Sequence, residues 1–332
     1  MKCAWTALWM LALWSGNTSG QAAEAWSESF DRDPMQSGWE VVGDASLFAW
    51  NPELKALAVA WDSSRTNSYF LKRLESPVTA SDDFGFGFGL KLSEHAVGTT
   101  PGKVGTFQIA LGLIRVADAS DPGFQRGVFL RSRNLVEWTW FGAQPDGAIS
   151  ASLSPAVVPA DGRLPWGFSD SYLELEMGVQ YGFDLTYTAT NRTLRISMTA
   201  DGNPLPTPAP VVLPRNFTGF RVDALSINSY SDVGQDPLYA GSVRAVGTVD
   251  DLRWNGPGAA VGVVRFEGND VVRRVVTGTR VGWRYWLESS GDLKAWEKVS
   301  EEVAGTGGEV VLQDATKGLP PERFYRVGGR LP

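Results

Sequence analysis

A stretch of alternating phenylalanine and glycine constrains the fold of this chain more than any other feature. Residues 83–92 read DFGFGFGLKL, so that large apolar residues alternate with glycine or lysine. A period of two places the apolar side chains on one face of a β-strand. The other face is almost bare backbone, and glycine inside a strand is costly unless another layer or a ligand approaches closely. We therefore expect a central strand of a large sandwich.

Short alternating runs recur along the rest of the chain, and no segment shows a sustained apolar repeat of 3.6 residues. The clearest run covers residues 181–188, followed by a polar turn and a second alternating run at 194–199. This pattern predicts an antiparallel hairpin with one buried and one solvated face. Many short strands separated by turn residues predict an all-β sandwich or barrel.

The N-terminus has the features of a secretory signal peptide. Lys2 is followed by an apolar run from Ala4 to Trp14 and by small residues that end in Ala23-Glu-Ala25. The apolar run is shorter than the ~20 residues that a membrane span needs. We expect residues 1–25 to be removed before Trp26, with a cut after Ala22 as the second choice. The protein would then be secreted or held in the cell envelope, without membrane insertion.

Composition excludes several classes of site. The only cysteine, Cys3, lies in the predicted signal peptide, so the mature chain has no disulfide and no thiolate. The net charge is −7 and no run of Lys or Arg occurs, which makes nucleic acid a poor partner. His95 is the only histidine and lies in the turn-rich segment 93–102, where an exposed loop position is expected.

Three segments together resemble a known fold family. The hairpin at 181–202, the segment Glu28-Ser-Phe-Asp31 near a Gly-Trp pair, and Thr248-Val-Asp-Asp-Leu-Arg-Trp254 resemble laminin-G-like, concanavalin-type jelly rolls. The resemblance covers about residues 26–256 and implies a jelly-roll sandwich. This fold carries lectins, glycosidases, lyases and adhesion modules, so the resemblance does not select an activity.

The C-terminal part predicts a second domain. Asn255-Gly-Pro-Gly258 is typical of a domain boundary. Residues 285–296 and 323–327 resemble a short β module that closes many exported proteins of Verrucomicrobia-like bacteria. We expect a small β-sandwich module over residues 257–332.

Catalytic residues are poorly supported. Glu174 and Glu176 would share a strand face about 6.6 Å apart, but the third acid of the Glu-x-Asp-x-x-Glu pattern of jelly-roll glycosidases is missing. For a lyase site, Gln108 lies in a plausible strand, but Ala110 stands where such families place a histidine. The two glutamates are weak catalytic candidates, and the sequence favours a protein that is not an enzyme.

Aromatic residues favour glycan binding instead, because sugar rings stack on flat aromatic groups. Eleven of the fourteen tryptophans follow the predicted signal peptide. Trp138 and Trp140 share one face of a strand and are either core residues or a sugar platform. Trp166, in a polar loop, is the more exposed candidate. The glycine face of residues 83–92 could form the floor of a groove, with Lys91 at its end.

A structural calcium is a further expectation. On the last strand of the jelly roll, Leu252 and Trp254 should face inward, and the same alternation would turn Asp250 inward. A buried carboxylate must be paired or bind a metal. Laminin-G-like domains often hold calcium here, and Asp31 lies on the strand expected nearby. An arginine partner for Asp250 is the alternative.

The sequence therefore predicts a secreted, non-catalytic carbohydrate-binding or adhesion protein whose partner is a polysaccharide or other glycan. A glycoside hydrolase or lyase on the same fold is the first alternative, and a purely structural envelope module is the second. The sequence indicates neither the glycan nor the oligomeric state.

Overall fold

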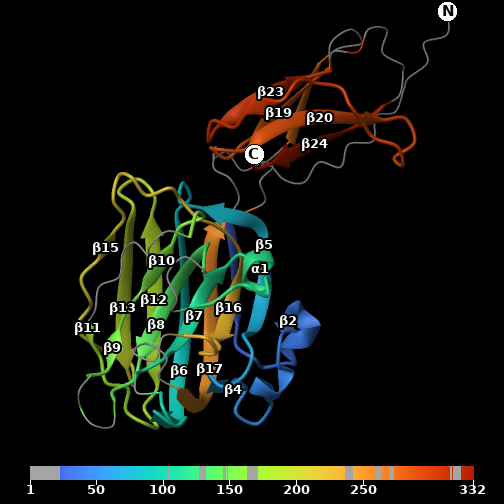
Figure 1. The fold of residues 1–332 in the computed structure, drawn as a ribbon. Helices are drawn as coiled ribbons and strands as arrows, with labels where there is room; N and C mark the ends of the chain where they lie inside the picture. Colours follow the sequence, from blue (N-terminus) through green and yellow to red (C-terminus); the bar gives the residue numbers. More distant parts are fainter. Residues whose placement is uncertain are drawn as a thin grey trace, which may run out of the picture. The chain divides into compact units, whose positions relative to one another are not determined.

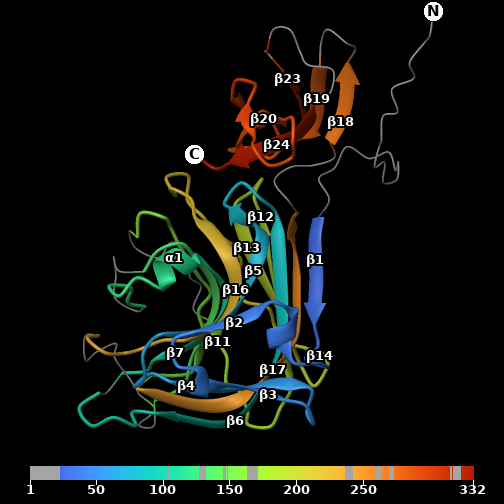
Figure 2. The ribbon, with the colours of Figure 1, turned by 90° about the vertical axis from the view of Figure 1, so that its right-hand side faces the viewer.

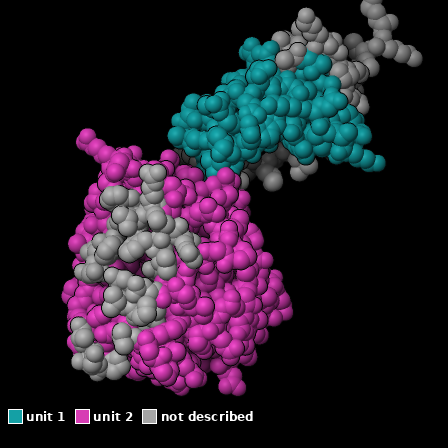
Figure 3. Space-filling model, viewed as in Figure 1, with its two compact units in different colours: residues 1–21, 261–332 teal, residues 22–260 magenta. Residues whose placement is uncertain are grey.

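The computed structural model describes most of the chain, and its contacts divide it into two compact units (Figures 1 and 3). The large unit is formed by residues 22–260, and the C-terminal unit contains residues 261–332. The described residues are 23–103, 105–126, 132–144, 147, 149–162, 171–235, 242–258, 264–268, 273–314, 316 and 323–332.

Two antiparallel sheets build the large unit (Figure 1). Sheet A contains nine described strands, in the order β14 (Asn203–Pro204), β13 (Thr193–Ala200), β12 (Tyr181–Thr188), β6 (Phe84–Val97), β17 (Val243–Pro257), β4 (Ala56–Asp62) and β3 (Phe48–Asn51), with β1 (Ala23–Glu28) on β17 and β15 (Val211–Val212) on β13. Sheet B contains eight, in the order β11 (Ser171–Tyr172), β9 (Ser152–Leu153), β8 (Leu135–Phe141), β7 (Gln108–Ile114), β16 (Arg221–Ser229), β5 (Ser68–Thr79) and β2 (Trp39–Val42), with β10 (Ala156–Val158) on β8.

The phenylalanine-glycine strand is central, as predicted. It forms the first part of β6, between β12 and β17, and Phe84, Phe86 and Phe88 are buried between the sheets. The ring of Phe88 meets the ring of Trp138 on sheet B edge to face, with centroids 5.4 Å apart. The apolar alternation therefore faces the sandwich interior, and the predicted all-β sandwich is confirmed.

The glycine face of β6 is covered by side chains of its neighbours. A Cβ at Gly87 would lie 2.6 Å from Nη2 of Arg253 and would also collide with Asp184. These two residues form an ion pair of 2.9 Å across the strand. At Gly89 the amide of Gln180 occupies the corresponding space. The glycines therefore make room for a layer of polar side chains, and the expected smooth floor is absent at Gly87 and Gly89.

A bulge changes the orientation of Asp250. Val249 and Leu252 are both buried although they are three residues apart, because Asp251 adopts a left-handed backbone (φ 47°) and the register of β17 against β6 shifts there. Such a bulge inserts one extra residue into the alternation. Asp250 consequently lies half-buried on the outer side of sheet A, and the expectation that it faces inward is wrong.

The outer side of sheet B carries a second layer. The short helix α1 (Val116–Ala119) follows β7, and Val116 and Ala119 pack with Tyr69 and Leu71 in a separate apolar cluster. Figure 2 shows α1 and its flanking loops beyond β16, on the side away from β1 and β17. Two 3₁₀ turns, η1 (Pro34–Ser37) and η2 (Ala45–Leu47), precede β2 and β3.

The C-terminal unit is a small β-sandwich of two sheets. Sheet C has the order β18 (Val264–Gly268), β19 (Arg273–Gly278) and β23 (Glu309–Gln313), and sheet D joins β20 (Arg284–Ser290) to β21 (Glu297–Lys298), β22 (Val303–Ala304) and β24 (Phe324–Arg330). Val275, Leu287 and Leu312 are among its buried residues.

The first described strand bears on the predicted signal cleavage. All six residues of β1 pair with β17, and Glu24 in it is buried and accepts a hydrogen bond from the Trp26 indole (3.2 Å). A cut after Ala22 leaves this strand whole, whereas a cut after Ala25 removes its first half. Among the described residues, no helix is long and apolar enough to span a membrane.

Candidate functional site

The outer face of sheet B is a polar surface built over small residues. On the central strand β7 this face presents Ala110 and Gly112, which pair with Thr139 and Glu137 of β8. On the other side of β7, Ala110 pairs with Asn228 of β16. Because Ala110 and Gly112 have almost no side chain, a long residue on β8 can reach across β7 to β16.

The side chain of Glu137 extends from β8 across β7 to β16 and is completely buried. Its carboxylate accepts hydrogen bonds from Nδ2 of Asn228 (2.7 Å), Nε of Arg126 (2.9 Å) and the hydroxyl of Tyr230. Burial, together with the negative charge of Glu137, raises the pKa of the Tyr230 phenol well above its usual range, so this hydroxyl remains a donor. The guanidinium of Arg126 neutralises the buried charge, as a buried carboxylate requires.

Two further side chains on this face have unused hydrogen-bonding groups. Gln108 is 2% exposed, and neither its amide nitrogen nor its carbonyl oxygen has a partner among the described residues. The hydroxyl of Thr139, on the neighbouring strand, is likewise buried and has none there. Buried polar groups are normally paired with protein, water or ligand, which makes this part of the face competent to hold a polar molecule.

An aromatic stack connects the polar face to the surface. The ring of Phe124 stacks on Tyr230 (centroids 6.1 Å apart), and Tyr230 meets Tyr69 edge to face at 5.9 Å. The hydroxyl of Tyr69 donates to the carbonyl of Ala119 at the end of α1 (3.1 Å). Glu137 therefore positions Tyr230, and Tyr230 supports Phe124.

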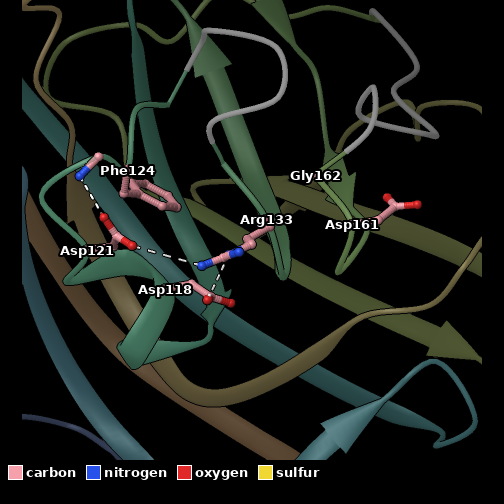
Figure 4. A pocket seen from close by; sticks show the side chains of 7 residues that line it. Asp118, Asp121, Phe124, Arg133, Asp161 and Gly162 are labelled. Atoms are coloured by element: carbon pink, nitrogen blue, oxygen red, sulfur yellow. Dashed lines mark hydrogen bonds and ion pairs between the residues drawn. The ribbon is translucent and has the colours of Figure 1, made fainter.

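Two hollows open beside Phe124, and both include Gly123 in their walls. Hollow 1 has a volume of about 360 Å³ and is lined by Asp118, Asp121, Arg133, Asp161 and Gly162. Figure 4 shows Arg133 between Asp118 and Asp121, with Asp161 on the far side of Arg133.

The polar groups of hollow 1 are of two kinds. Asp118 is buried and engaged, because it accepts from Nε of Arg133 (2.8 Å) and from Nδ2 of Asn134 (2.6 Å). Asp121 is half-exposed, lies 4.0 Å from Nη2 of Arg133, and accepts a hydrogen bond from the backbone N–H of Gly123 at its other oxygen (2.7 Å). Hollow 1 thus offers one buried carboxylate, Asp118, and two half-exposed charged groups, Asp121 and Arg133.

Hollow 2 has a volume of about 370 Å³ and is lined by Thr66, Asn67, Pro122, Gln125, Ser231, Val233 and Gly234, besides the two shared residues. Asn67 holds its walls together: Nδ2 donates to the carbonyl of Phe124 (3.1 Å), and Oδ1 accepts from the backbone N–H of Ser231 (2.8 Å). Gln125 donates to the carbonyl of Val233 (2.5 Å) across the opening.

The predicted aromatic site is not formed. Trp138 and Trp140 are 0% and 1% exposed between the two sheets, so neither ring can stack on a sugar, and the core alternative is correct. Trp166 lies outside the described residues. Lys91 is exposed on the outer side of sheet A, away from the hollows.

The weak catalytic pair is exposed. Glu174 and Glu176 alternate with buried Leu173 and Leu175, but they lie beyond the end of β11 and belong to no strand. The expected shared strand face is therefore absent. His95, expected in a loop, lies in β6, where its ring meets Trp140 edge to face at 4.9 Å.

The predicted calcium ligands have other surroundings. Asp31 is paired with Lys55 at 2.8 Å, and the hydrogen bond from Lys55 lowers the pKa of Asp31. Burial raises the pKa of Asp250, and Asp31 is one of the charges that act on it. No group of three or more His, Cys, Asp or Glu side chains within the described part of the chain is arranged to hold a metal ion. A structural calcium stays a prediction.

Sequence reasoning missed Glu137 and the hollows around Phe124. A signal for Glu137 exists in the run Val136-Glu-Trp-Thr-Trp140, where a charged residue and a threonine alternate with large apolar residues. The run does not indicate that a neighbouring strand carries alanine and glycine, which is what allows the carboxylate to be buried and satisfied.

No family model matches the chain, and no curated protein matches it significantly. Peanut lectin is similar in structure, with 11% identity over 70% of this chain and 97% of the lectin, at a TM-score of 0.45. The seed lectin of Lotus tetragonolobus has 12% identity over 70% of this chain and 98% of the lectin, at a TM-score of 0.44. An alginate lyase, Aly36B, in complex with an alginate tetrasaccharide has 12% identity over 69% of this chain and 96% of the lyase, at a TM-score of 0.40. Similarity at this level concerns the β-sandwich fold and does not identify a ligand or an activity.

Proposed function

We propose that this protein is an exported, non-catalytic carbohydrate-binding protein and that a neutral glycan binds in hollows 1 and 2. The observation that carries the proposal is the pair of polar hollows that share Gly123 and Phe124 over the outer face of sheet B. Each has the size expected of a small-molecule site, for which the usual range is about 300–1,000 Å³.

The chemistry of hollow 1 supports a neutral glycan. Asp121 and Asp161 can accept hydrogen bonds from sugar hydroxyls, and the half-exposed guanidinium of Arg133 can donate to ring or hydroxyl oxygens. Three carboxylates against one guanidinium give the described lining a negative charge, which disfavours acidic sugars.

The state of Glu137 supports binding without catalysis. This carboxylate lies on the polar face, but it is completely buried and accepts three hydrogen bonds. An acid or base catalyst must come within hydrogen-bonding distance of the substrate. Glu137 therefore acts on the hollows through Tyr230 and Phe124.

A glycan array followed by calorimetry on the mature protein tests the proposal. We expect binding of a neutral glycan that weakens at least about tenfold when Asp121→Ala and Arg133→Gln are combined, because both hydrogen-bonding groups are removed. Lys91→Ala, on the outer side of sheet A, is the control and should leave binding unchanged. A folded protein that binds no neutral glycan, or binding that depends on Lys91, contradicts the proposal. Release of reducing ends that is lost in Glu174→Gln would replace it with the hydrolase alternative.

A further inference from the structure

The C-terminal unit carries a surface of alternating aromatic and charged side chains on the outer face of sheet D. We call it the tryptophan face and define it by Trp286, Glu288, Trp296, Lys298 and Arg326. Strand alternation places it outside, because the intervening residues of β20 are buried and the members of the face are half-buried or exposed. Register places Glu288 directly opposite both Arg326 and Lys298.

Contacts order these side chains into one continuous row. The guanidinium of Arg326 lies 4.4 Å from the ring centre of Trp296, and its Nε donates to Glu288 (2.6 Å). The other oxygen of Glu288 accepts from Nε1 of Trp286 (2.9 Å), and Nζ of Lys298 lies 5.4 Å from the Trp286 ring. The hydrogen bond from Trp286 and the pair with Arg326 lower the pKa of Glu288, so the row stays ionised.

A glycine in β24, Gly328, makes room for the indole ring of Trp286. Trp286 pairs across the sheet with Gly328 of β24, and a Cβ at Gly328 would lie 2.5 Å from Nε1 of the indole and 2.7 Å from Cζ2. The indole therefore lies directly against the strand, which only glycine permits. The ring is supported from below and half-buried, which is the arrangement that a stacking surface needs.

The charge of this face differs from that of the chain as a whole. The net charge of the protein is −7, but the residues that strand alternation places on the described outer face of sheet D include more cations than carboxylates. The cations are Arg284, Lys298, Arg326 and Arg330, and the carboxylates are Glu288 and Glu302. Lys298 and Arg330 share Glu302 at 2.9 and 3.0 Å. Each carboxylate is thus already engaged, and cationic charge remains in excess.

We propose that the tryptophan face binds an anionic polysaccharide. Lys298 and Arg326, which lie over the indoles of Trp286 and Trp296, would move onto the acidic groups of the polymer, and sugar rings would stack on the indole faces thus uncovered. The excess positive charge favours anionic over neutral polymers on this face, whereas the carboxylates of hollow 1 repel acidic ones. This proposal does not depend on the function proposed for the large unit.

Calorimetry of the full mature chain with alginate, a polyuronate, and with a neutral β-glucan tests the inference. Trp286→Ala and Arg326→Gln should each weaken alginate binding at least about tenfold, since each removes one element of the row. Binding should also fall as salt rises from 50 to about 500 mM, because salt screens contacts between exposed charges.

Arg265→Gln is the matched control. Arg265 and Arg326 are equally exposed (both 54%), and each is paired with glutamate, but Arg265 lies on sheet C. Arg265→Gln should therefore leave alginate binding unchanged, as should Asp121→Ala in hollow 1. If Trp286→Ala fails to fold, Arg326→Gln, which changes a half-exposed side chain, still decides the question. Absence of alginate binding, an equal loss with Arg265→Gln, or equal binding of the neutral glucan overturns the proposal.

Discussion

The outer faces of sheets A and B follow the same alternation of polar and apolar residues but end in opposite environments. On sheet A the polar residues Asp184 and Arg253 form an exposed ion pair over Gly87. On sheet B, Glu137 of β8 forms a buried ion pair with Arg126 of the segment that follows α1. In both faces a glycine or alanine on the central strand makes room for a longer side chain from a neighbouring strand.

The exposed ion pair on sheet A and the buried ion pair on sheet B differ in what they contribute to the fold. An exposed pair is solvated before and after folding and contributes little. A buried pair is satisfied only by its partners, so it fixes the positions of the groups around it and is strongly destabilising when broken. We infer that sheet B, where polar groups are held rigidly under an aromatic stack, is the face that positions a site.

The largest expected effect comes from breaking the buried pair. Glu137→Ala leaves Arg126, Asn228 and Tyr230 without their acceptor and should lower the free energy of unfolding by about 3–5 kcal/mol. Urea denaturation followed by tryptophan fluorescence measures the loss. Asp184→Ala, which breaks the exposed pair on sheet A, is the control and should cost about 0–1 kcal/mol. Equal losses in the two variants would remove the distinction between the faces.

A smaller effect is expected from the glycines beneath the two faces. A Cβ at Gly112 on sheet B would lie 2.7 Å from the Cα of Glu137 and would collide with the carbonyl of Val136, both of which are backbone atoms. Gly112→Ala should therefore lower the free energy of unfolding by about 1–3 kcal/mol.

Gly85→Ala on sheet A provides the matched comparison. The nearest atom to a Cβ at Gly85 is the carbonyl oxygen of Leu185, 3.2 Å away, so the neighbour must move only slightly. The replacement also reduces the entropy of the unfolded chain, and we expect a change of less than about 1 kcal/mol. A larger loss of stability in Gly85→Ala than in Gly112→Ala would contradict this explanation of the two faces.

Sequence patterns predicted the positions of the strands better than they predicted which face of each strand is buried. The hairpin of β12 and β13 is paired as expected, with Tyr181 opposite Ala200 and Thr188 opposite Thr193. The period of two placed Phe84, Phe86 and Phe88 on one face of their strand, and that face is buried. It failed at Asp250, because a bulge at Asp251 inserts a residue that no local pattern indicates.

The candidate site was harder to predict because it depends on contacts between distant segments. Glu137 is satisfied by Asn228 on the non-adjacent strand β16 and by Tyr230 just after it, both more than ninety residues away. Trp138 and Trp140 were ambiguous because both faces of β8 turned out to be buried, one by sheet A and one by the layer that contains α1. A sequence shows the period of a strand but not how many of its faces are covered.

The smallest expected effect concerns the junction between the two sheets, where His95 of sheet A meets Trp140 of sheet B. Burial lowers the pKa of His95, so the folded chain favours its neutral form. As the pH falls through about 6.5, the unfolded chain binds a proton at this residue that the folded chain does not bind. Stability should therefore decrease between pH 7 and about 5.5.

Because His95 is the only histidine, the His95→Gln variant should lose this part of the pH dependence. Unfolding midpoints at pH 7 and 5.5 measure the difference. Asp250→Asn is an informative companion, since burial raises the pKa of Asp250, and its protonation adds stability as the pH falls. Asp250→Asn should therefore make stability fall more steeply as the pH decreases, whereas His95→Gln should make it fall less steeply. Identical slopes in wild type and His95→Gln would mean that the histidine ring is as well solvated in the folded chain as in the unfolded one, and that the two sheets do not enclose it.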